Sequence, residues 1–373
     1  MPHSILIEPR DPLIFRDARP AEASLPLRSM DWPLPSSVIG AIRTRLGRLT
    51  GYDAEAIERL KNIEHVGPVL AIRKDDGWEL AFPAPADAVV FPGISGAEVV
   101  ALRPRPVDAM ANEGCDMPQG LSPLFGARDL KPLLGPSFWT SSNMLAWLAD
   151  DKMPEAGSLG PGKFARQTRI HLEIEPKTFV AKEGRLFTTE GLELAWTDAK
   201  GVRQSGAICS QIRTTDNAWA PLEALAPLGG ERRLAYWSEP DILWPAPPAE
   251  LAETELIRLQ LITPAAFARG WKPGWLNDAN QGSPPEHPDL ILELVGAAVQ
   301  RAVPHSGWDL TKPARRAQKP ARFLAPAGSV YFFKASRKID ARPLWLRSIC
   351  DDPQDRRDGF GVVLCGGWKW QSE

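Results

Sequence analysis

Cysteine is scarce in this chain of 373 residues, and its four cysteines, Cys115, Cys209, Cys350 and Cys365, form no CxxC pair. Thiols without paired spacing, outside a small secreted scaffold, indicate reduced cysteines and a cytoplasmic protein. No apolar run approaches the roughly 18 residues that a membrane span needs. The start MPHSILIEPRD lacks a basic region followed by a long apolar core, so we expect no signal peptide and no membrane partner.

Complete catalytic and cofactor motifs are also missing. No GK[ST] follows a glycine-rich loop, no third glycine opens a helix after a GxG, and GxSxG, HExxH and DxD arrangements are absent. The five histidines are widely separated and none has the spacing of a metal ligand: His3, His65, His171, His287 and His305. The sequence therefore predicts no metal site, no cofactor and no enzyme activity.

The charge balance is nearly neutral, with a formal net charge of −2. This excludes a uniformly basic nucleic-acid binder, although a local basic patch remains possible. Arginine supplies 30 of the 44 basic residues. A planar guanidinium binds phosphates with two parallel hydrogen bonds and stacks on bases, which an ammonium does less well. A high-GC genome would produce the same bias, so both explanations stay open.

Proline is abundant, with 37 residues, roughly twice the usual share. Such a content predicts many short elements joined by stiff loops. Residues 3–9 are typical of a strand. Ile39, Ile42, Leu46 and Leu49 recur at helical spacing and predict a helix over 36–50, which Ser36 or Ser37 would cap.

Further elements follow in the same way. The pattern predicts, in chain order, a helix over 54–61, a hairpin over 66–83, a loop region over 103–137, a short helix over 141–149 and a flexible loop over 157–166. Apolar residues then alternate with polar ones over 167–176, as in a strand. Residues 244–250, WPAPPAE, are typical of a stiff linker.

This order of elements predicts an α+β fold. A strand, a helix and a hairpin followed by many strands suit the ferredoxin-like (RRM-related) arrangement in each of two halves, with long Pro/Gly-rich insertions. We expect an N-terminal domain over 1–243 and a C-terminal domain over 251–373 that ends in a glycine-rich loop.

Residues 310–339 contain eight basic side chains and no acidic one. Prolines separate Lys312, Arg315, Arg316, Lys319 and Arg322, and they would hold a loop extended so that several cations follow one phosphate backbone. This composition favours nucleic-acid contact. A solvated basic loop beside a buried hairpin is the alternative.

A smaller basic window contains Lys163, Arg166, Arg169 and His171, with no acid between Pro161 and Leu172. Arg169 and His171 share one face of the expected strand, because residues two apart point the same way. A histidine beside an arginine can assist acid–base cleavage of RNA. It can equally be a polar surface or packing residue.

Glycine gathers near the C-terminus in DGFGVVLCGGW, residues 358–368. Gly359, Gly361, Gly366 and Gly367 would let backbone N–H groups approach an anion closely and form a phosphate nest. Tight turns near the end of the chain explain them as well.

Six segments together resemble one family. PLIFRDARP, PLPSSVIGAIRTRL, TRIHLEI, LITPAAFARGWKPGW, RRAQKPARFLAPAGSVYFF and GFGVVLCGGW occur in the order seen in the third subunit of the Cmr-type (type III-B) CRISPR effector complex, a member of the RAMP superfamily. The resemblance implies two ferredoxin-like halves and a non-catalytic role: gripping the 5′ handle of the CRISPR RNA. It also implies two kinds of protein partner, the large polymerase-like subunit and the backbone RAMP subunits.

The resemblance and the basic windows define a candidate RNA-binding set. It comprises Arg16, Arg19, Ser36, Ser37, Arg43, Lys163, Arg166, Arg169, His171, Trp271, Lys272, Arg315, Arg316, Lys319, Gly359, Gly361, Gly366 and Gly367. The chain departs from the family at Ala18, where glycine is common, and at KTFVAKEG, which replaces a Thr-Gly-Thr-like turn. A helix N-terminus with nearby arginines would hold a phosphate backbone without cutting it.

Two other functions remain possible. A metal-independent endoribonuclease that processes CRISPR repeat RNA would use His171 as general acid or base. A scaffold that binds only proteins would assemble without RNA, and its assembly would show no unusual dependence on salt.

Overall fold

A computed structural model describes residues 2–16, 27–50, 53–93, 96–106, 117–118, 120–126, 128–150, 153–198, 200–214, 221–307 and 319–371. The α-helices are α1 (Pro35–Thr50), α2 (Ala54–Lys61), α3 (Ser141–Asp150) and α4 (Pro353–Arg357). The strands are β1 (His3–Pro9), β2 (Leu27–Arg28), β3 (Glu64–Lys74), β4 (Gly77–Pro83), β5 (Ala88–Gly93), β6 (Gly96–Ala101), β7 (Arg103–Pro104), β8 (Leu124–Phe125), β9 (Phe138–Thr140), β10 (Ala165–Ile174), β11 (Ala181–Glu193), β12 (Ala195–Thr197), β13 (Arg203–Arg213), β14 (Ala224–Pro227), β15 (Leu234–Ser238), β16 (Thr254–Leu261), β17 (Gln281–Gly282), β18 (Leu292–Ala298), β19 (Val303–His305), β20 (Arg322–Leu324), β21 (Val330–Ile339) and β22 (Val363–Gly367).

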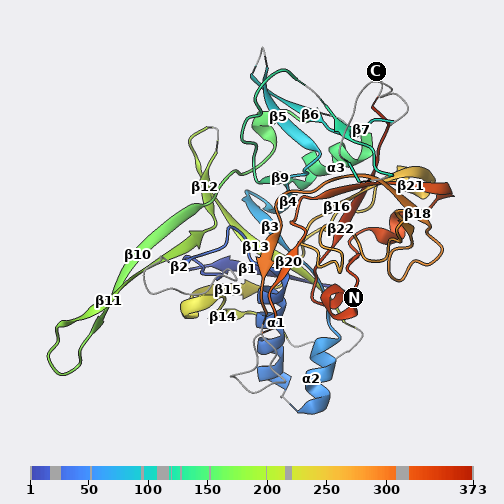
Figure 1. Ribbon diagram of the computed structural model, residues 1–373. Helices are drawn as coiled ribbons and strands as arrows, with labels where there is room; N and C mark the ends of the chain where they lie inside the picture. The colour runs from blue at the N-terminus through green and yellow to red at the C-terminus, as the bar shows by residue number, and fades with distance from the viewer. Residues whose placement is uncertain are drawn as a thin grey trace.

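Two large antiparallel sheets organise the molecule (Figure 1). The first has the order β14-β15-β1-β13-β3-β4-β9, with β12 attached to β13, and the second has the order β17-β18-β21-β16-β22. All strands of the first sheet precede residue 239 and all strands of the second follow residue 253. The change of sheet therefore coincides with the predicted linker, residues 244–250.

The two sheets share one apolar core. A single cluster of buried side chains includes Leu6 and Val66 from the first sheet and Leu259 and Phe333 from the second. The α+β class is confirmed, whereas separate domains and ferredoxin-like halves stay predictions. In the second half, the only α-helix among the described residues is α4, which has five residues.

The helix predicted near the N-terminus is confirmed as α1, which buries Val38, Ile39, Ile42 and Leu46 at helical spacing. The capping prediction is wrong. The helix begins at Pro35, a residue suited to the first helical position because proline lacks the N–H that would be unpaired there. Ser36 and Ser37 therefore lie within the first turn and not at the cap.

Several local predictions agree with the structure in their bounds. The strand over 3–9 is β1, the hairpin over 66–83 is β3–β4, and the helices over 54–61 and 141–149 are α2 and α3. α2 is capped by Asp53, whose carboxylate accepts a hydrogen bond of 2.7 Å from the Ala56 amide. These elements have regular apolar patterns or strong end signals, so sequence was enough to find them.

One buried ionic cluster fastens the insertion β5–β8 and α3 to the second sheet. Asp87 is fully buried and accepts hydrogen bonds from Arg103 (2.8 Å), from Arg258 (3.0 Å) and from the Trp147 indole (3.3 Å). The two guanidinium groups lie over the Trp147 ring at 5.1 and 5.2 Å. A buried carboxylate needs such partners, because an unpaired charge in the interior is costly.

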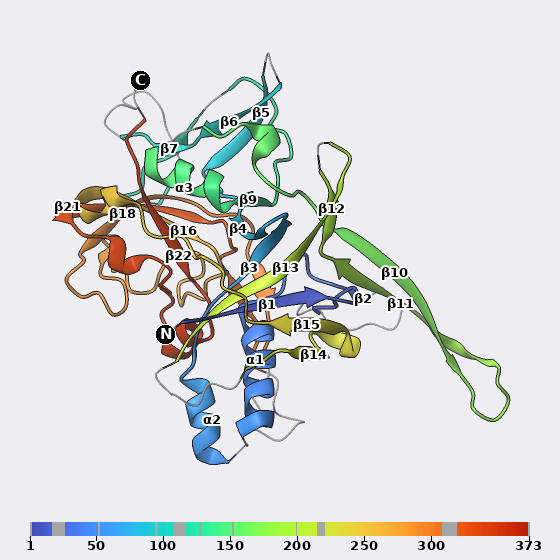
Figure 2. The same ribbon diagram turned by 180° about the vertical axis from the view of Figure 1, so that it is seen from behind.

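The hairpin β10–β11, which we call the arm, extends away from both sheets (Figures 1 and 2). Its two strands pair with each other. Among the described residues, β11 pairs further only near its C-terminal end, where two residues pair with β2 and Leu192 forms a bridge with Leu13. In the part of the chain that the structure describes, no helix combines the length and apolarity needed to cross a bilayer.

Candidate nucleic-acid interface

The arm presents two different faces. Arg169 is opposite Thr189 and His171 is opposite Phe187 in the register of β10 and β11, so these four side chains share one face. The His171 imidazole stacks on the Phe187 ring with centroids 5.1 Å apart and planes inclined by 11°, and its Nε2 lies 2.9 Å from the Thr189 hydroxyl. A flat stacked pair beside a guanidinium is the kind of surface on which unpaired bases stack.

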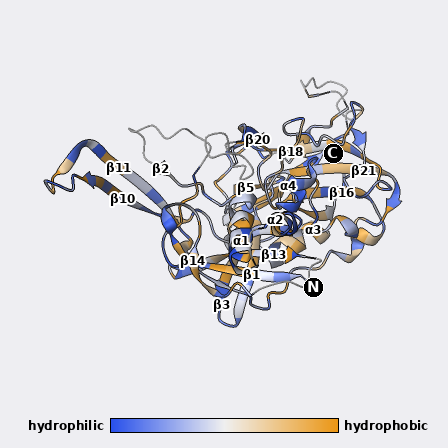
Figure 3. Ribbon diagram, turned by 90° about the horizontal axis from the view of Figure 1, so that it is seen from below, coloured by the Kyte–Doolittle hydropathy of each residue, from blue (hydrophilic) through white to orange (hydrophobic). Residues whose placement is uncertain are grey.

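The opposite face of the arm is aliphatic. Ile170 is 70% exposed, Leu172 is 50% exposed, and Leu186, the partner of Leu172, is 65% exposed. Figure 3 shows hydrophobic and hydrophilic segments side by side along the arm. A two-stranded sheet has no second layer to cover such side chains, which marks this face as a contact surface.

The base of the arm is held by Arg166. Its guanidinium donates to the Glu190 carboxylate at 2.6 Å, to the Ser29 carbonyl at 2.8 Å and to the Asp31 carboxylate. Arg166 therefore positions the arm on the body of the protein. Lys163 is exposed, and it lies at an open groove of the insertion rather than on the arm.

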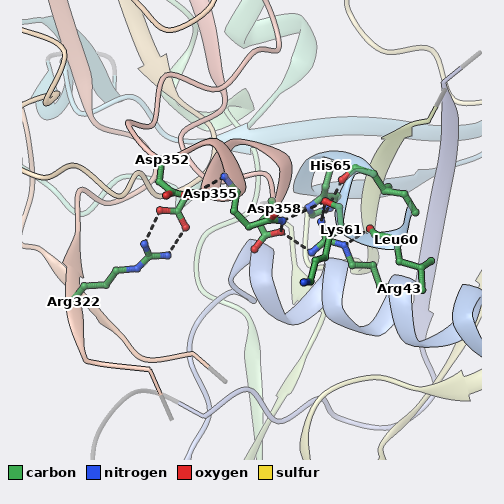
Figure 4. A network of polar contacts seen from close by, with 10 residues as sticks. Arg43, Leu60, Lys61, His65, Arg322, Asp352, Asp355 and Asp358 are labelled. Atoms are coloured by element: carbon green, nitrogen blue, oxygen red, sulfur yellow. Dashed lines mark hydrogen bonds and ion pairs between the residues drawn. The ribbon is translucent and has the colours of Figure 1, made fainter. Parts of the chain in front are cut away.

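Arg43 serves as an internal clamp (Figure 4). Its guanidinium donates to the carbonyls of Leu60 (2.8 Å), Lys61 (3.2 Å) and Ile63 (3.3 Å), and it forms an ion pair with Asp358 at 2.6 Å. The sequence predicted a polar helix position facing a phosphate backbone. The structure instead uses this side chain to join α1, the end of α2 and the segment after α4.

His65 belongs to the same network. Its Nδ1 lies 3.0 Å from the carbonyl oxygen of Asp358 and its Nε2 lies 2.9 Å from the Ser210 hydroxyl. A carbonyl only accepts, so the neutral ring carries its proton on Nδ1 and accepts at Nε2 from the hydroxyl. Burial lowers the pKa of His65 to about 4.

The glycines near the C-terminus pack against the protein itself. Gly359 has φ +87°, and a Cβ there would come within 2.6 Å of His65 Nδ1. A Cβ at Gly361 would meet Cys350 Sγ at 2.6 Å, and one at Gly366 would meet the Leu148 carbonyl at 2.7 Å. All three glycines are buried, so glycine is required at these positions because neighbouring segments pack too closely for a side chain. The predicted phosphate nest has no support at these three positions. Gly367 is half-buried, and a Cβ there would meet no atom within 4 Å.

Residues 270–272, with the sequence Gly-Trp-Lys, lie in a turn beside β21 of the second sheet. Trp271 is 37% exposed and its carbonyl accepts a 2.7 Å hydrogen bond from Tyr331. Lys272 donates to the Asn280 side chain at 2.6 Å and to the Asn277 carbonyl at 3.1 Å. Trp271 thus offers part of its ring to solvent, whereas Lys272 holds the turn closed.

The remaining candidates are only partly described. Arg16 is exposed and forms a β-bridge with Ser29. Lys319 is exposed, and its backbone amide donates a hydrogen bond of 2.8 Å to the Gly307 carbonyl. Arg19, Arg315 and Arg316 lie outside the described residues.

Segments from both ends of the chain do converge. Arg322 donates to both carboxylate oxygens of Asp355 at 2.6 Å on one side of α4, and Arg43 binds Asp358 on the other side (Figure 4). α1, β20 and the segment after α4 therefore meet around α4. This junction is made by ion pairs inside the protein, which already satisfy these charges.

Sequence reasoning missed a polar cavity beside this network. It is lined by Arg213, Arg347, Arg356 and Arg357 together with His287. Arg213 ends an apolar strand, and Arg356 and Arg357 form a pair just before the glycines. Arg213, a cation at the end of a largely buried strand, was the one signal in the sequence. No local pattern brings the four arginines together.

Comparison with known proteins assigns the class. Residues 5–368 match the family described as CRISPR-associated protein (Cas_Cmr3). This match shows that the strand-rich α+β protein is a CRISPR-associated protein. Within that class it belongs to the Cas_Cmr3 family, and the predicted resemblance to the third Cmr subunit is confirmed.

Solved structures show distant likenesses. Two cryo-EM structures of the Type III-B Cmr-beta bound to cognate target RNA, one also with AMPPnP, contain a similar chain at 16% and 15% identity, with TM-scores of 0.45 and 0.44, covering 88% of this chain and 86% of that one. A crystal structure of the Csm3-Csm4 subcomplex of the type III-A interference complex matches at 10% identity and a TM-score of 0.36, covering 90% of this chain and 98% of that one. No curated protein sequence matches the chain.

Proposed function

We propose that this protein is a non-catalytic RNA-binding subunit of a type III-B CRISPR RNA-guided surveillance complex, which grips the 5′ handle of the CRISPR RNA and docks the large polymerase-like subunit. Family membership supports a place in such a complex. The observation that carries the RNA-binding part is the stacked His171–Phe187 pair beside Arg169 on the exposed arm. Such a face combines a stacking platform with a cation, as single-stranded RNA requires.

The surroundings of His171 favour binding over cleavage. Its Nε2 contacts the Thr189 hydroxyl and its ring face is covered by Phe187. A general acid or base needs a nitrogen directed at the scissile phosphate, usually with a second titrating group nearby. A neutral hydroxyl partner and a stacked ring suit a positioned platform better.

The aliphatic face of the arm would serve the protein partners. Ile170, Leu172 and Leu186 give an exposed apolar strip that RNA, a polyanion, does not match. We assign this strip to a neighbouring protein subunit. In this arrangement RNA and protein bind opposite faces of one thin sheet.

The test measures affinity for a fluorescent CRISPR RNA that carries its 5′ handle. Phe187→Ala and Arg169→Glu are expected to weaken binding about tenfold or more, because stacking contributes about 1–3 kcal/mol per base. Arg301→Glu is the matched control, since Arg301 is exposed just after β18, a strand far from the arm in Figures 1 and 2. Unchanged affinity in both arm variants would refute the assignment.

One assay separates the alternatives. The purified protein is incubated with repeat RNA in EDTA. We expect no cleavage; product that appears and then disappears with His171→Ala would establish the endoribonuclease instead. Partner binding that persists without RNA and without salt dependence would favour the protein-only scaffold.

A further inference from the structure

A cavity of about 140 Å³ lies where the two halves of the protein meet. The end of β13 supplies Arg213, the segment after Leu344 supplies Arg347 and Ser348, and α4 supplies Arg356 and Arg357. His287 approaches from the loop between β17 and β18. The lining is therefore rich in hydrogen-bond donors from four separate segments.

Two of the four arginines have carboxylate partners at the edge of this cavity. Arg347 lies 3.2 Å from Glu64, and Arg356 lies 3.3 Å from Glu286. Arg213 and Arg357 have none within ion-pair distance among the described residues, and Arg357 has no hydrogen-bond partner there either. Four arginines against two glutamates leave the lining with two uncompensated positive charges.

Arg213 is the more enclosed of the two unpaired arginines. Its guanidinium donates to the Gln211 side-chain oxygen and to the Leu346 carbonyl, each at 3.2 Å, and both acceptors are neutral. Burial, followed by the positive charge of Arg347, lowers the pKa of Arg213. Burying a guanidinium in this way is costly. The Glu64 carboxylate, which is paired with Arg347, offsets only part of this cost, and an oxyanion in the cavity would offset more of it.

Size and chemistry restrict the ligand. The cavity volume of about 140 Å³ leaves room for a phosphate group. Guanidinium groups match the spacing of phosphate oxygens, and His287 lines the same cavity.

We propose that this cavity binds a phosphate group, carried by inorganic phosphate, by a mononucleotide whose nucleoside remains outside, or by an RNA chain. Arg213 comes from the first sheet and Arg357 from the second half, so the bound phosphate ties the halves together. The proposal does not rest on the RNA-binding role of the arm, which is a different part of the molecule.

Thermal unfolding of the full chain at constant ionic strength tests the proposal, with inorganic phosphate, AMP and the CRISPR RNA as separate ligands. A ligand that binds only the folded state raises the melting temperature in a saturable way. We expect this rise with at least inorganic phosphate or AMP, and we expect Arg357→Gln to abolish it. Arg357 has no hydrogen-bond or ion-pair partner among the described residues, so its replacement removes no such interaction there.

Arg301→Gln is the control and should keep the full rise, as Arg301 is exposed outside the cavity. A rise with RNA that Arg357→Gln abolishes, while both small ligands have no effect, would support the cavity as an RNA phosphate site. The same rise in wild type and Arg357→Gln, or no rise with any of the three ligands, would overturn the proposal. The arm variants test a different proposal: if they do not affect RNA affinity, the thermal shifts expected for the cavity stay the same.

Discussion

Gly359 shows how one missing side chain can fix a junction. It has φ +87°, and a Cβ would lie 2.6 Å from His65 Nδ1 and 2.7 Å from the His65 carbonyl oxygen. We predict that Gly359→Ala destabilises the protein by about 2 kcal/mol or more, through both strained backbone and overlap. Urea unfolding measures this, with Gly367→Ala as control, because a Cβ at Gly367 meets nothing within 4 Å. Equal stability of the two variants would contradict the packing role of Gly359.

His65 predicts a pH dependence. Its pKa is about 4 in the folded state, against roughly 6.5 when unfolded. The unfolded chain therefore binds more protons between these values, so stability is complete above pH 6.5 and falls as the pH drops toward 4. The slope from this group is at most about 1.4 kcal/mol per pH unit. Melting temperatures of wild type and His65→Gln over this window should converge on acidification; parallel curves would contradict the assignment.

The same residues show why single positions were hard to assign from sequence. Arg43 was correctly placed on a helix, but its ionic partner Asp358 lies 315 positions away. A helical wheel distinguishes apolar from polar positions and cannot tell an arginine that faces solvent from one that faces a distant carboxylate. Arg213, Arg347 and Arg357 are likewise gathered only by the complete fold.

Elements with a local signal were found reliably. β1 is a short apolar run, α2 is a patch with helical spacing, and the β3–β4 hairpin has two apolar segments around a turn, so each signal lies within a few residues. Sheet order was not accessible in this way. β1 pairs with β13, roughly two hundred residues later, and no sequence pattern specifies that register.

The arm provides a prediction about an element. Ile170 is directly opposite Thr188, so an Asn-Gly turn can replace residues 171–187 and close the shortened hairpin. The arm tip packs on neither sheet, so we expect an unchanged melting temperature together with loss of RNA affinity. Circular dichroism and RNA binding measure the two quantities. A large drop in melting temperature would show that the tip contributes to folding.

At the scale of the whole molecule, stability depends on contacts between the insertion and the second sheet. Asp87 is fully buried between Arg103 of the insertion and Arg258 of the second sheet. We predict that Asp87→Asn destabilises the protein by about 3–5 kcal/mol, because it removes the carboxylate charge that two buried guanidinium groups share. Chemical unfolding monitored by tryptophan fluorescence is suitable, since Trp147 lies within the cluster.

The insertion offers a matched control for that substitution. Glu98 and Arg128 also form an acid–arginine pair, at 3.1 Å, but their side chains are 47% and 54% exposed. Glu98→Gln should therefore change stability by less than about 1 kcal/mol. If Asp87→Asn has an equally small effect, the insertion is held by its apolar contacts and by backbone hydrogen bonds such as Ser122 to Val295. If the large difference is found, a single carboxylate joins the insertion, α3 and the second sheet.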